Sequence, residues 1–434
     1  MSLLLFNPVI LSVIAMSLLC LLRLNVFLSI VIAAFVAGLV SGLDITQVMK
    51  IMTEGMQGNL ETALSYVFLG ILAVAIAQGN FTKILVYKIS SFINQKRFMF
   101  CIFIAFIACF SQNLVPIHIA FIPILIPPLL GLMNKMKLDR RAVACALAFG
   151  LEAPYICIPI GFGLIFQTII KDQMIQNGIQ VSIRDIASVM WIGSFGMLVG
   201  LIFAIFVLYR KPRDYGEIEL EYKQLSSTKL EKRDYLMLLS AFIAFIVQIF
   251  TSSLPLGAFV GIVLMICFGV IEWKKMDGLV ESGISSMAFI AFVMLIAAGY
   301  GAVLKETGGI KELVEVTAGF VNGKLGGAIL MLLIGLLVTM GIGTAFGTLP
   351  VIAAFYCPLC IKLGFSVESS ILLLGIAGAL GDAGSPAAST TIGPTSGLNI
   401  DGKHHHIWDT CVPTFLVYNI PLFIFGLIGA MFLS

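Results

Sequence analysis

Two short polar stretches in an otherwise apolar chain hold the residue types that could do chemistry. Residues 381–399, GDAGSPAASTTIGPTSGLN, contain one acid, two prolines, four glycines and six hydroxyl residues. Residues 150–163, GLEAPYICIPIGFG, contain one acid and two prolines. Because proline removes a backbone donor and glycine weakens a helix, neither stretch is expected to be a continuous helix.

A helix that is broken inside a membrane offers two kinds of binding group. Its freed carbonyls can hold a cation, and its exposed helix N-termini can hold an anion. The two acids are Glu152 and Asp382, and a carboxylate at the centre of a membrane costs roughly 2.5–3.5 kcal/mol. We therefore predict that both acids are functional, the alternative being a structural pair bonded to backbone. If both approach one site, like-charge repulsion should favour proton uptake by one of them.

Polar residues also interrupt two further apolar stretches, SQNLVPIH (111–118) and GIGTAFGT (341–348). Asn and Thr oxygens suit Na+, because hard cations prefer oxygen ligands. The alternative is that small residues at these places let helices pack closely. The predicted ion- or substrate-binding residues are Glu152, Asp382, Asn113, His118, Thr344, Thr348, Ser385, Ser389, Thr390 and Thr391.

The bulk composition sets the environment in which these residues must work. The chain has 434 residues, of which 59% are hydrophobic and 11% charged, with a mean hydropathy of +1.06. A soluble domain carries about twice that share of charge, so we expect an all-α, multi-pass protein of the cytoplasmic (inner) membrane. The net charge of +3 gives no reason to expect a nucleic-acid partner. The nine cysteines lie mostly in apolar runs, where free thiols are expected, and no cofactor is predicted.

Charge-free runs mark the expected spans, since about 20 apolar residues cross a bilayer. In the first half of the chain they lie near 8–22, 24–42, 62–82, 98–113, 114–134, 142–170 and 187–209. In the second half they lie near 236–250, 255–272, 282–304, 325–343, 344–361, 369–400 and 409–433. A charged linker separates the two sets, which predicts three units at 1–209, 210–234 and 235–434.

The two sets of spans share one layout of charge. Arg97 and Lys135 enclose 37 uncharged residues, and Lys324 and Lys362 enclose another 37 at a shift of 227. The two acids of the polar stretches correspond at a shift of 230, which requires a slip of three residues. An internal repeat is predicted, chance patterning of apolar spans being the alternative. Seven elements per half is an odd number, so the repeat should be inverted, whether the 37-residue runs are paired crossings or re-entrant hairpins.

The basic residues predict the orientation. With the linker in the cytoplasm and the N-terminus outside, 19 of the 26 Lys and Arg residues fall in cytoplasmic loops and 7 fall outside. This bias follows the positive-inside rule. The segment KHHHIWD (403–409) then lies at the cytoplasmic mouth. Its three adjacent histidines cannot all face one way, so no dedicated metal site is predicted there.

Two of the polar segments resemble known transporter families. GTAFGTLPV (343–351) resembles the G-T-S-W-G-T signature of the C-type sodium/proton antiporter family, with Ala345 and Phe346 in place of Ser and Trp. The segment from GDAGSP to HHHIWDT (381–410) is similar to a subgroup of amino-acid permeases, histidine being the substrate suggested for it. Both belong to the ion transporter superfamily. The resemblance covers essentially the whole chain and implies inverted repeats with hairpins and broken helices, often a homodimer, and elevator-like movement of a transport domain.

The functional hypothesis is a cation-coupled secondary transporter, in one of two versions. In the first, Na+ or H+ drives a small amino acid such as histidine, its carboxylate on a helix start at Ser385-Pro386 and its amine toward Asp382. In the second, Na+ and H+ compete for the two acids and no organic solute moves. A channel would need a continuous polar pore, and an intramembrane enzyme would need an aligned nucleophile and base. We found neither pattern, so no enzymatic activity is predicted.

Overall fold

The fold is built from helices throughout the part of the chain that the structure describes. This computed structural model describes residues 7–22, 24–77, 96–113, 122, 126, 129–216, 231–251, 253–309, 312, 323–386 and 388–434. Every regular element in these ranges is an α-, 3₁₀- or π-helix. The predicted all-α class is confirmed.

The helices follow the predicted spans closely. In the first half they are α2 (Pro8–Leu21), α3 (Val26–Val40), α4 (Ile45–Gly55), α5 (Leu60–Ala77), α7 (Arg97–Asn113), α9 (Leu130–Lys135), α10 (Arg140–Cys157), α11 (Phe162–Gln176) and α12 (Ile183–Phe203). In the second half they are α13 (Lys232–Thr251), α14 (Leu254–Cys267), α15 (Met276–Glu306), α17 (Gly323–Ile342), α18 (Ala345–Leu363), α19 (Val367–Ala379), α20 (Ser389–Leu398), α21 (Val412–Thr414) and α22 (Ile420–Phe432). Short 3₁₀- or π-helices are η1 (Met56–Asn59), η3 (Ala204–Leu208), η5 (Trp273–Lys275), η6 (His406–Cys411) and η7 (Phe415–Asn419).

Several of these helices can cross a membrane. Among the described residues, four segments are long and apolar enough, namely Ile183–Leu208, Gly323–Met340, Ala345–Leu363 and His406–Phe432. A fifth span results if α10 and α11, which are bent by 47°, count as one broken span. The chain is therefore a multi-pass membrane protein, as predicted. The expected span at 114–134 lies mostly outside the described residues.

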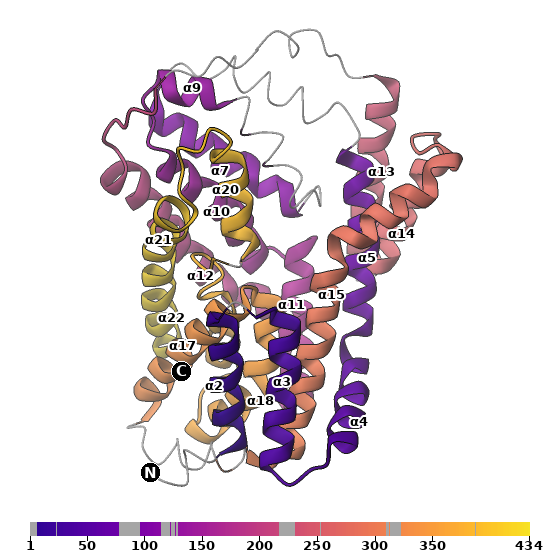
Figure 1. Ribbon diagram of the computed structural model, residues 1–434, viewed down its shortest axis with the longest axis vertical. Coiled ribbons are helices and arrows are strands. Elements are labelled where there is room, and N and C mark those ends of the chain that lie inside the picture. The colour runs from indigo at the N-terminus through magenta and orange to yellow at the C-terminus, as the bar shows by residue number, and fades with distance from the viewer. Residues whose placement is uncertain are drawn as a thin grey trace.

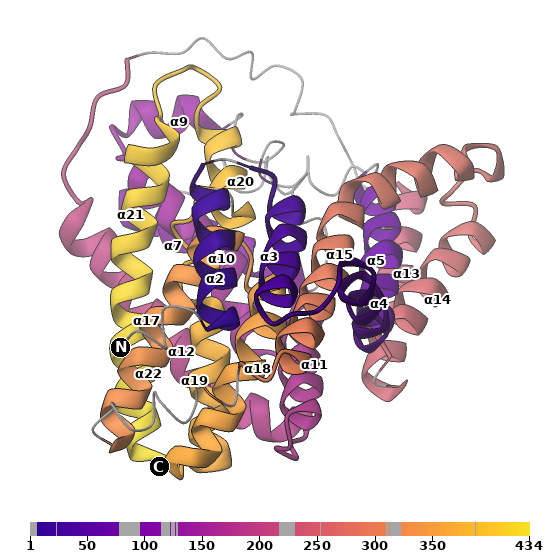
Figure 2. The same cartoon turned by 60° about the horizontal axis from the view of Figure 1, so that its bottom comes forward.

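The helices gather in two groups that lie side by side (Figures 1 and 2). Helices α4, α5, α13, α14 and α15 pack on one another on the right of Figure 1. The second group contains α7, α10–α12 and α17–α22. Each half of the chain gives its early helices to the first group and its later helices to the second. Contacts of α15 with α18, and of the α2–α3 pair with α15 and α17, join the groups.

Local sequence explains where several helices begin and end. Asp44 and Gln47 form a reciprocal capping box at α4, in which the Gln47 backbone N–H donates to the Asp44 carboxylate at 2.8 Å. Ser182 and Asp185 form the same motif at α12. Gly364 ends α18 with a φ of 73°, the left-handed conformation that glycine adopts at little cost. These ends follow ordinary capping rules, unlike the two breaks described below.

Helix boundaries recur along the chain at one constant shift. Helices α10 and α19 begin 227 residues apart, at Arg140 and Val367, and so do α11 and α20, at Phe162 and Ser389. The three-residue slip between the two acids is therefore not needed to superimpose the two broken helices. At the constant shift, the residue that matches Asp382 is Tyr155.

The two broken helices run in opposite directions and meet at their breaks. Arg140, at the start of α10, donates to the carbonyl of Leu398, the last residue of α20, at 2.8 Å. Ser366, which caps the start of α19, donates to the Leu433 carbonyl at 2.6 Å. The continuous helical segment His406–Phe432 connects these two regions, so they lie at opposite ends of the helix group. The inner ends of α10 and α19 therefore approach each other in the interior.

Candidate functional site

The first break separates α10 from α11. Pro154 lies in the last turn of α10, and Gly161 has a φ of 57° in the break. Glycine is also required at Gly163, because a Cβ there would stand 1.9 Å from the carbonyl oxygen of Ile158. The chain thus folds tightly back on itself before α11 begins. This geometry ends α10 in the interior, with the predicted acid one and a half turns before its end.

The second break lies between α19 and α20 and is braced by a residue of the last span. Gly381 and Gly384 have φ values of 88° and 103°. The side chain of Asn419 accepts from the Gly381 N–H at 2.6 Å and donates to the Ala383 carbonyl at 2.7 Å. These bonds lie on either side of Asp382 in the sequence. Asn419 therefore fixes the backbone that carries the acid.

Asp382 is buried and well supplied with hydrogen bonds. Its side chain is 4% exposed, and its Oδ2 accepts from the Tyr155 hydroxyl at 2.6 Å. The Thr390 hydroxyl lies 3.5 Å from its Oδ1 and donates to the Asp382 backbone carbonyl at 2.8 Å. The backbone N–H of Ala345, the first residue of α18, also faces the carboxylate. A negative charge is favoured at such a helix N-terminus.

Glu152 lies beside Asp382 but has no comparable support. Its side chain is fully buried, and neither carboxylate oxygen makes a hydrogen bond within the described ranges. The carboxylate of Asp382 and the backbone N–H of Ala383 lie close enough to interact with it. The structure thus brings the two predicted acids together, one from each half of the chain, in two different environments.

Aromatic rings cover one side of this pair. The Tyr155 ring lies 5.2 Å from the Phe166 ring and 5.4 Å from the Phe346 ring, measured between centroids. Phe162 also stacks edge-on to Phe346, with their centroids 6.2 Å apart. Phe346 comes from α18, and the other three come from α10 and α11. The rings lock the Tyr155 hydroxyl in its direction toward Asp382.

The predicted hydroxyl residues surround the breaks but are bonded to backbone carbonyls. Thr348 donates to the Thr344 carbonyl at 3.0 Å, and Ser385 donates to the Met340 carbonyl at 3.1 Å. Thr391 donates to the carbonyls of Ser385 and Ala388 at 2.5 and 2.9 Å. A hydroxyl in this state still has lone pairs for a cation, but its proton is already used.

The expected helix start at Ser385-Pro386 is wrong. Helix α20 begins at Ser389, with Ala388 as the preceding cap residue. Gly381 and Gly384 hold left-handed backbone just before this point, and the chain takes four more residues to enter the helix. A helix N-terminus does exist here, one turn later than the sequence indicates.

The remaining predicted residues are only partly placed. Thr344 is half-buried and precedes α18, but its side chain makes no capping hydrogen bond. Ser389 is half-buried at the start of α20. Asn113 ends α7, and its side chain is not described. His118 lies outside the described residues.

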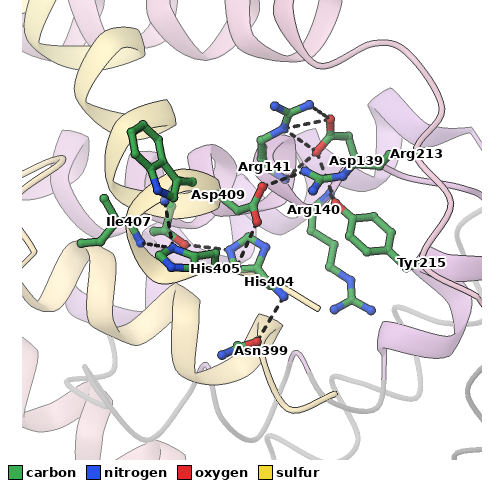
Figure 3. A network of polar contacts seen from close by, with 12 residues as sticks. Asp139, Arg140, Arg141, Arg213, Tyr215, Asn399, His404, His405, Ile407 and Asp409 are labelled. Carbon is green, nitrogen blue, oxygen red and sulfur yellow. Dashed lines mark hydrogen bonds and ion pairs between the residues drawn. The ribbon is translucent and has the colours of Figure 1, made fainter. Parts of the chain in front are cut away.

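The three histidines of the KHHHIWD segment each make a different local contact, and Figure 3 shows those of His404 and His405. His404 is buried and lies 2.7 Å from the Thr410 hydroxyl, while its backbone N–H donates to Asn399. His405 accepts from the N–H groups that begin η6. His406 lies 2.8 Å from the Thr395 hydroxyl through Nδ1. Burial lowers the pKa of His404 to about 4, so its ring is neutral at physiological pH.

Salt bridges tie this loop to the start of α10 and to the linker. Arg140 is fully buried, and its guanidinium donates to both carboxylate oxygens of Asp401 at 2.6 Å. The Tyr215 ring lies 4.4 Å from the same guanidinium. Arg213 bonds Asp409 at 2.7 Å (Figure 3). A buried arginine is stable only when paired in this way. The loop, the linker start and α10 therefore form one connected polar end of the helix group.

Sequence reasoning missed two residues of the site. Tyr155 stands three residues after Glu152, a spacing that places both on one helix face, and it matches Asp382 at the shift of 227. Asn419 is a buried polar residue inside an apolar span. Both signals were present, because a polar side chain deep in a membrane span requires a partner.

Comparison with protein families gives two matches. A model described as the Na+/H+ antiporter family matches residues 146–427, and a second, described as the Na+-H+ antiporter family, matches residues 7–93. The first match alone covers both broken helices and both buried acids.

Similar proteins were found by sequence and by structure. A Bacillus subtilis protein named "Putative amino acid transporter YuiF" is 44% identical over 98% of this chain and 100% of its own length. An uncharacterized membrane protein of Haemophilus influenzae is 43% identical over 98% of this chain and 99% of its own. The YdaH transporter of Alcanivorax borkumensis aligns with a TM-score of 0.61, 14% identity, and 98% and 97% coverage of the two chains. Neisseria gonorrhoeae MtrF, reported among a class of antimetabolite efflux pumps, aligns with a TM-score of 0.57, 16% identity, and 89% and 85% coverage. At such low identity these two structures show a shared fold alone.

Proposed function

Since this chain belongs to the Na+/H+ antiporter family, we propose that it is a secondary transporter that couples Na+ or H+ to the movement of a small amino acid, histidine first among those to test. The observation that carries the proposal is the meeting of Glu152 and Asp382 at the junction of two broken helices. Broken helices at the middle of a membrane are where secondary transporters bind ions and substrates.

The unequal surroundings of the two acids supply a coupling mechanism. A buried carboxylate without a partner is costly, so Glu152 is stable in this conformation when it carries a proton or when a cation lies against it. Asp382 is stabilised as an anion by Tyr155 and by the start of α18. A cation entering between them would therefore displace the proton of Glu152. Release of the cation on the other side would let the proton return.

The two halves are proposed to be inverted repeats, which would bring each acid to the same place from opposite faces of the membrane. The constant shift of 227 between the starts of the broken helices supports this proposal. So does their opposite direction, which follows from the bond of Arg140 to the end of α20. Alternating exposure of a site at such a junction requires that one helix group move against the other. The two groups joined by α15 and α18 are suited to that movement.

The amino-acid substrate rests on chemistry and on one relative. A zwitterion presents an amine, which two acids attract, and a carboxylate, which the N–H groups at the start of α20 can bind. The relative named for amino acid transport matches the whole chain at 44% identity. These points favour an organic substrate over an ion alone.

Na+/H+ exchange without an organic substrate is the second candidate. One observation favours it. The hydroxyls of Thr348, Thr390 and Thr391 already donate to backbone carbonyls, so they offer lone pairs to a cation but no proton to a substrate carboxylate.

Proteoliposome assays separate the two candidates. Purified protein would be tested for uptake of labelled histidine and other small amino acids under Na+ and H+ gradients, beside a pH-sensitive dye. Gradient-dependent amino-acid uptake that is lost in Glu152→Gln is the expected result. If the dye reports Na+-driven proton movement and no labelled amino acid enters under any gradient, the permease proposal is wrong and the exchange reading holds.

A further inference from the structure

A cavity separate from the acids opens at the polar end of the second helix group. It has a volume of about 350 Å³ and lies between the start of α7, the start of α10 and the π-helix η3 that ends the α12 span. Ala142 lines it, ten residues before Glu152 on the same helix. At a rise of about 1.5 Å per residue, the cavity is about 15 Å from the acids along α10. It therefore cannot be part of the transport site itself.

Two arginines line the cavity, and they differ from their neighbours. Arg97 and Arg210 form no ion pair with any residue in the described ranges. The nearby Arg140, Arg141 and Arg213 are each paired with an aspartate. The two arginines thus bring positive charge to the cavity that no described residue matches.

The guanidinium of Arg97 is held in place. Its Nε donates to the carbonyl of Met136 at 2.7 Å, which leaves the two Nη groups as donors. Arg210 follows the end of η3 and is exposed. The guanidinium of Arg97 is fixed, and that of Arg210 is free to adjust. Two guanidinium groups of this kind are a good arrangement for binding a phosphate group.

Apart from Tyr209, the other residues that line the cavity are apolar. Phe98 and Phe206 stand at its edge, 43% and 45% exposed, with ring centroids 5.7 Å apart. Behind them lie the buried Cys101 and Ile205. A small hydrophilic anion would satisfy the arginines but would gain nothing from these walls. The lining therefore fits a ligand with an anionic head and an apolar body.

An apolar track continues from the cavity along α7. Phe98, Ile102 and Phe106 are spaced four residues apart, so they lie on one face of the helix, and all are 43–59% exposed. On the neighbouring span, Ile202 stands one turn before Phe206 and is also exposed. These residues lead from the arginines toward the middle of the membrane.

We propose that this cavity binds an anionic phospholipid, with the phosphate head on Arg97 and Arg210 and one acyl chain along the Phe98–Phe106 face of α7. Basic pockets between helices at the cytoplasmic surface are suited to such headgroups, since anionic lipids gather in that leaflet. The predicted orientation places both arginines on the cytoplasmic side. The lipid would bridge α7 and the last turn of the α12 span, and it would stabilise the helix group that carries the acids.

The test measures binding of defined lipids to the purified full-length protein. Phosphatidylglycerol and phosphatidylcholine with identical acyl chains, and inorganic phosphate alone, would be titrated in detergent, with native mass spectrometry and thermal unfolding as readouts. Phosphatidylglycerol should bind and raise the apparent Tm, and neither of the other two should. Arg210→Gln should weaken phosphatidylglycerol binding at least fivefold, and Arg97→Gln with Arg210→Gln should abolish it.

Controls keep the result decisive even if Arg97→Gln folds poorly. Arg210 is exposed and forms no ion pair with the described residues, so its variant should keep the wild-type Tm without lipid. Arg184→Gln, at an exposed arginine on the start of α12, should bind phosphatidylglycerol like the wild type. Equal binding of both lipids, protection by phosphate alone, or unchanged binding in Arg210→Gln would each overturn the proposal.

Discussion

The hydroxyl of Tyr155 has one proton to donate, and in this conformation it donates it to Asp382. A cation that binds Asp382 must compete with that bond, because both draw on the same carboxylate. Glu152 has no such competitor within the described structure. The Tyr155 phenol is therefore one of the groups that distinguish the two acids, and its contribution can be tested by removing one oxygen atom.

Tyr155→Phe should keep the ring contacts with Phe166 and Phe346 and lose only the bond to Asp382. A hydrogen bond to a charged group contributes about 1.5–3 kcal/mol, so the freed carboxylate should hold the coupling ion about tenfold more tightly or better. The KM for that ion and the maximal rate should both fall, because release becomes slow. Uptake measured against ion concentration tests this. Tyr300→Phe, which loses a buried bond to Ser12 in the other helix group, should change neither.

Glu152→Gln and Asp382→Asn should each abolish or strongly impair transport while the protein still folds and inserts. The reason is that an amide has nearly the shape of the acid but cannot exchange a proton. Glu152→Gln removes a buried carboxylate without a hydrogen-bond partner in the described structure, so its apparent Tm should equal or exceed that of the wild type. Near-normal flux in either variant would return that residue to a structural role.

At the scale of elements, each break depends on groups outside the broken helix. The second break is held by Asn419 from the last span, and the last turn before the first break is held by Ser194 of α12, which donates to the Ala153 carbonyl. The loop after α20 is held by Arg140 from α10. An element that is irregular in this way is stable only as long as its neighbours satisfy its backbone.

Asn419→Ala should destabilise the protein by at least about 2 kcal/mol. It leaves the Gly381 N–H and the Ala383 carbonyl buried without partners, and each such group costs about 1–3 kcal/mol. Thermal unfolding in detergent measures the change. Asn177→Ala is the matched control, because that side chain also bonds a carbonyl, of Gln173, but at a half-exposed helix end. An equal effect of both variants would argue against a special role for Asn419.

The buried His404 should make stability depend on pH. Burial lowers its pKa from 6.5 to about 4, so between these values the unfolded chain takes up a proton that the folded protein does not. Stability present at neutral pH is therefore lost as the pH falls from 6.5 toward 4, by about 3 kcal/mol at most. His404→Gln, which can still bond Thr410 but does not titrate there, should show a smaller drop in apparent Tm between pH 7 and pH 5. Identical drops would contradict this account.

At the scale of the whole molecule, four of the basic residues that the sequence assigned to the cytoplasmic side meet at one end. Lys137, Arg140, Arg213 and Lys403 all contact the start of the linker or its partners there. Positively charged loops are attracted to the anionic lipids of the cytoplasmic leaflet. This end of the molecule is therefore predicted to be cytoplasmic.

Cysteine labelling of intact cells tests the orientation. In a background without reactive cysteines, Ser226→Cys in the linker should resist a membrane-impermeant maleimide, and Gln180→Cys, in the exposed turn between α11 and α12, should react. Opening the cells should make the first position react as well. The reverse pattern in intact cells would place the linker outside and overturn the assignment.

The span positions, the broken helices and the two acids could be predicted from the sequence, because apolar length, proline and buried charge act locally. The residues that contact the acids were harder to predict from the sequence. Asn419 lies 37 residues beyond Asp382, and only the packed fold brings them together. The start of α20 was misplaced by four residues, because Ser385-Pro386 has the pattern of a helix start and α20 begins at Ser389. The binding roles of all the predicted site residues stay predictions, and for Asn113 and His118 the structure does not describe the side chain either.

The bond between Tyr155 and Asp382 joins two positions 227 residues apart, the same shift that relates the starts of the two broken helices. If a two-fold axis relates the halves, these two positions are mates, that is, equivalent positions in the two halves. Because they are in contact, they lie close to the axis. In a symmetric pair of identical half-length chains, each residue near the axis would face its own copy. Two aspartates would repel there, and two tyrosines would lack an anion to bond. Joining the halves in one polypeptide allows the mates to differ, so that one becomes a donor and the other an acceptor. Under the proposed repeat, a pair of identical half-length chains could not make this donor and acceptor pair, whereas the fused chain can.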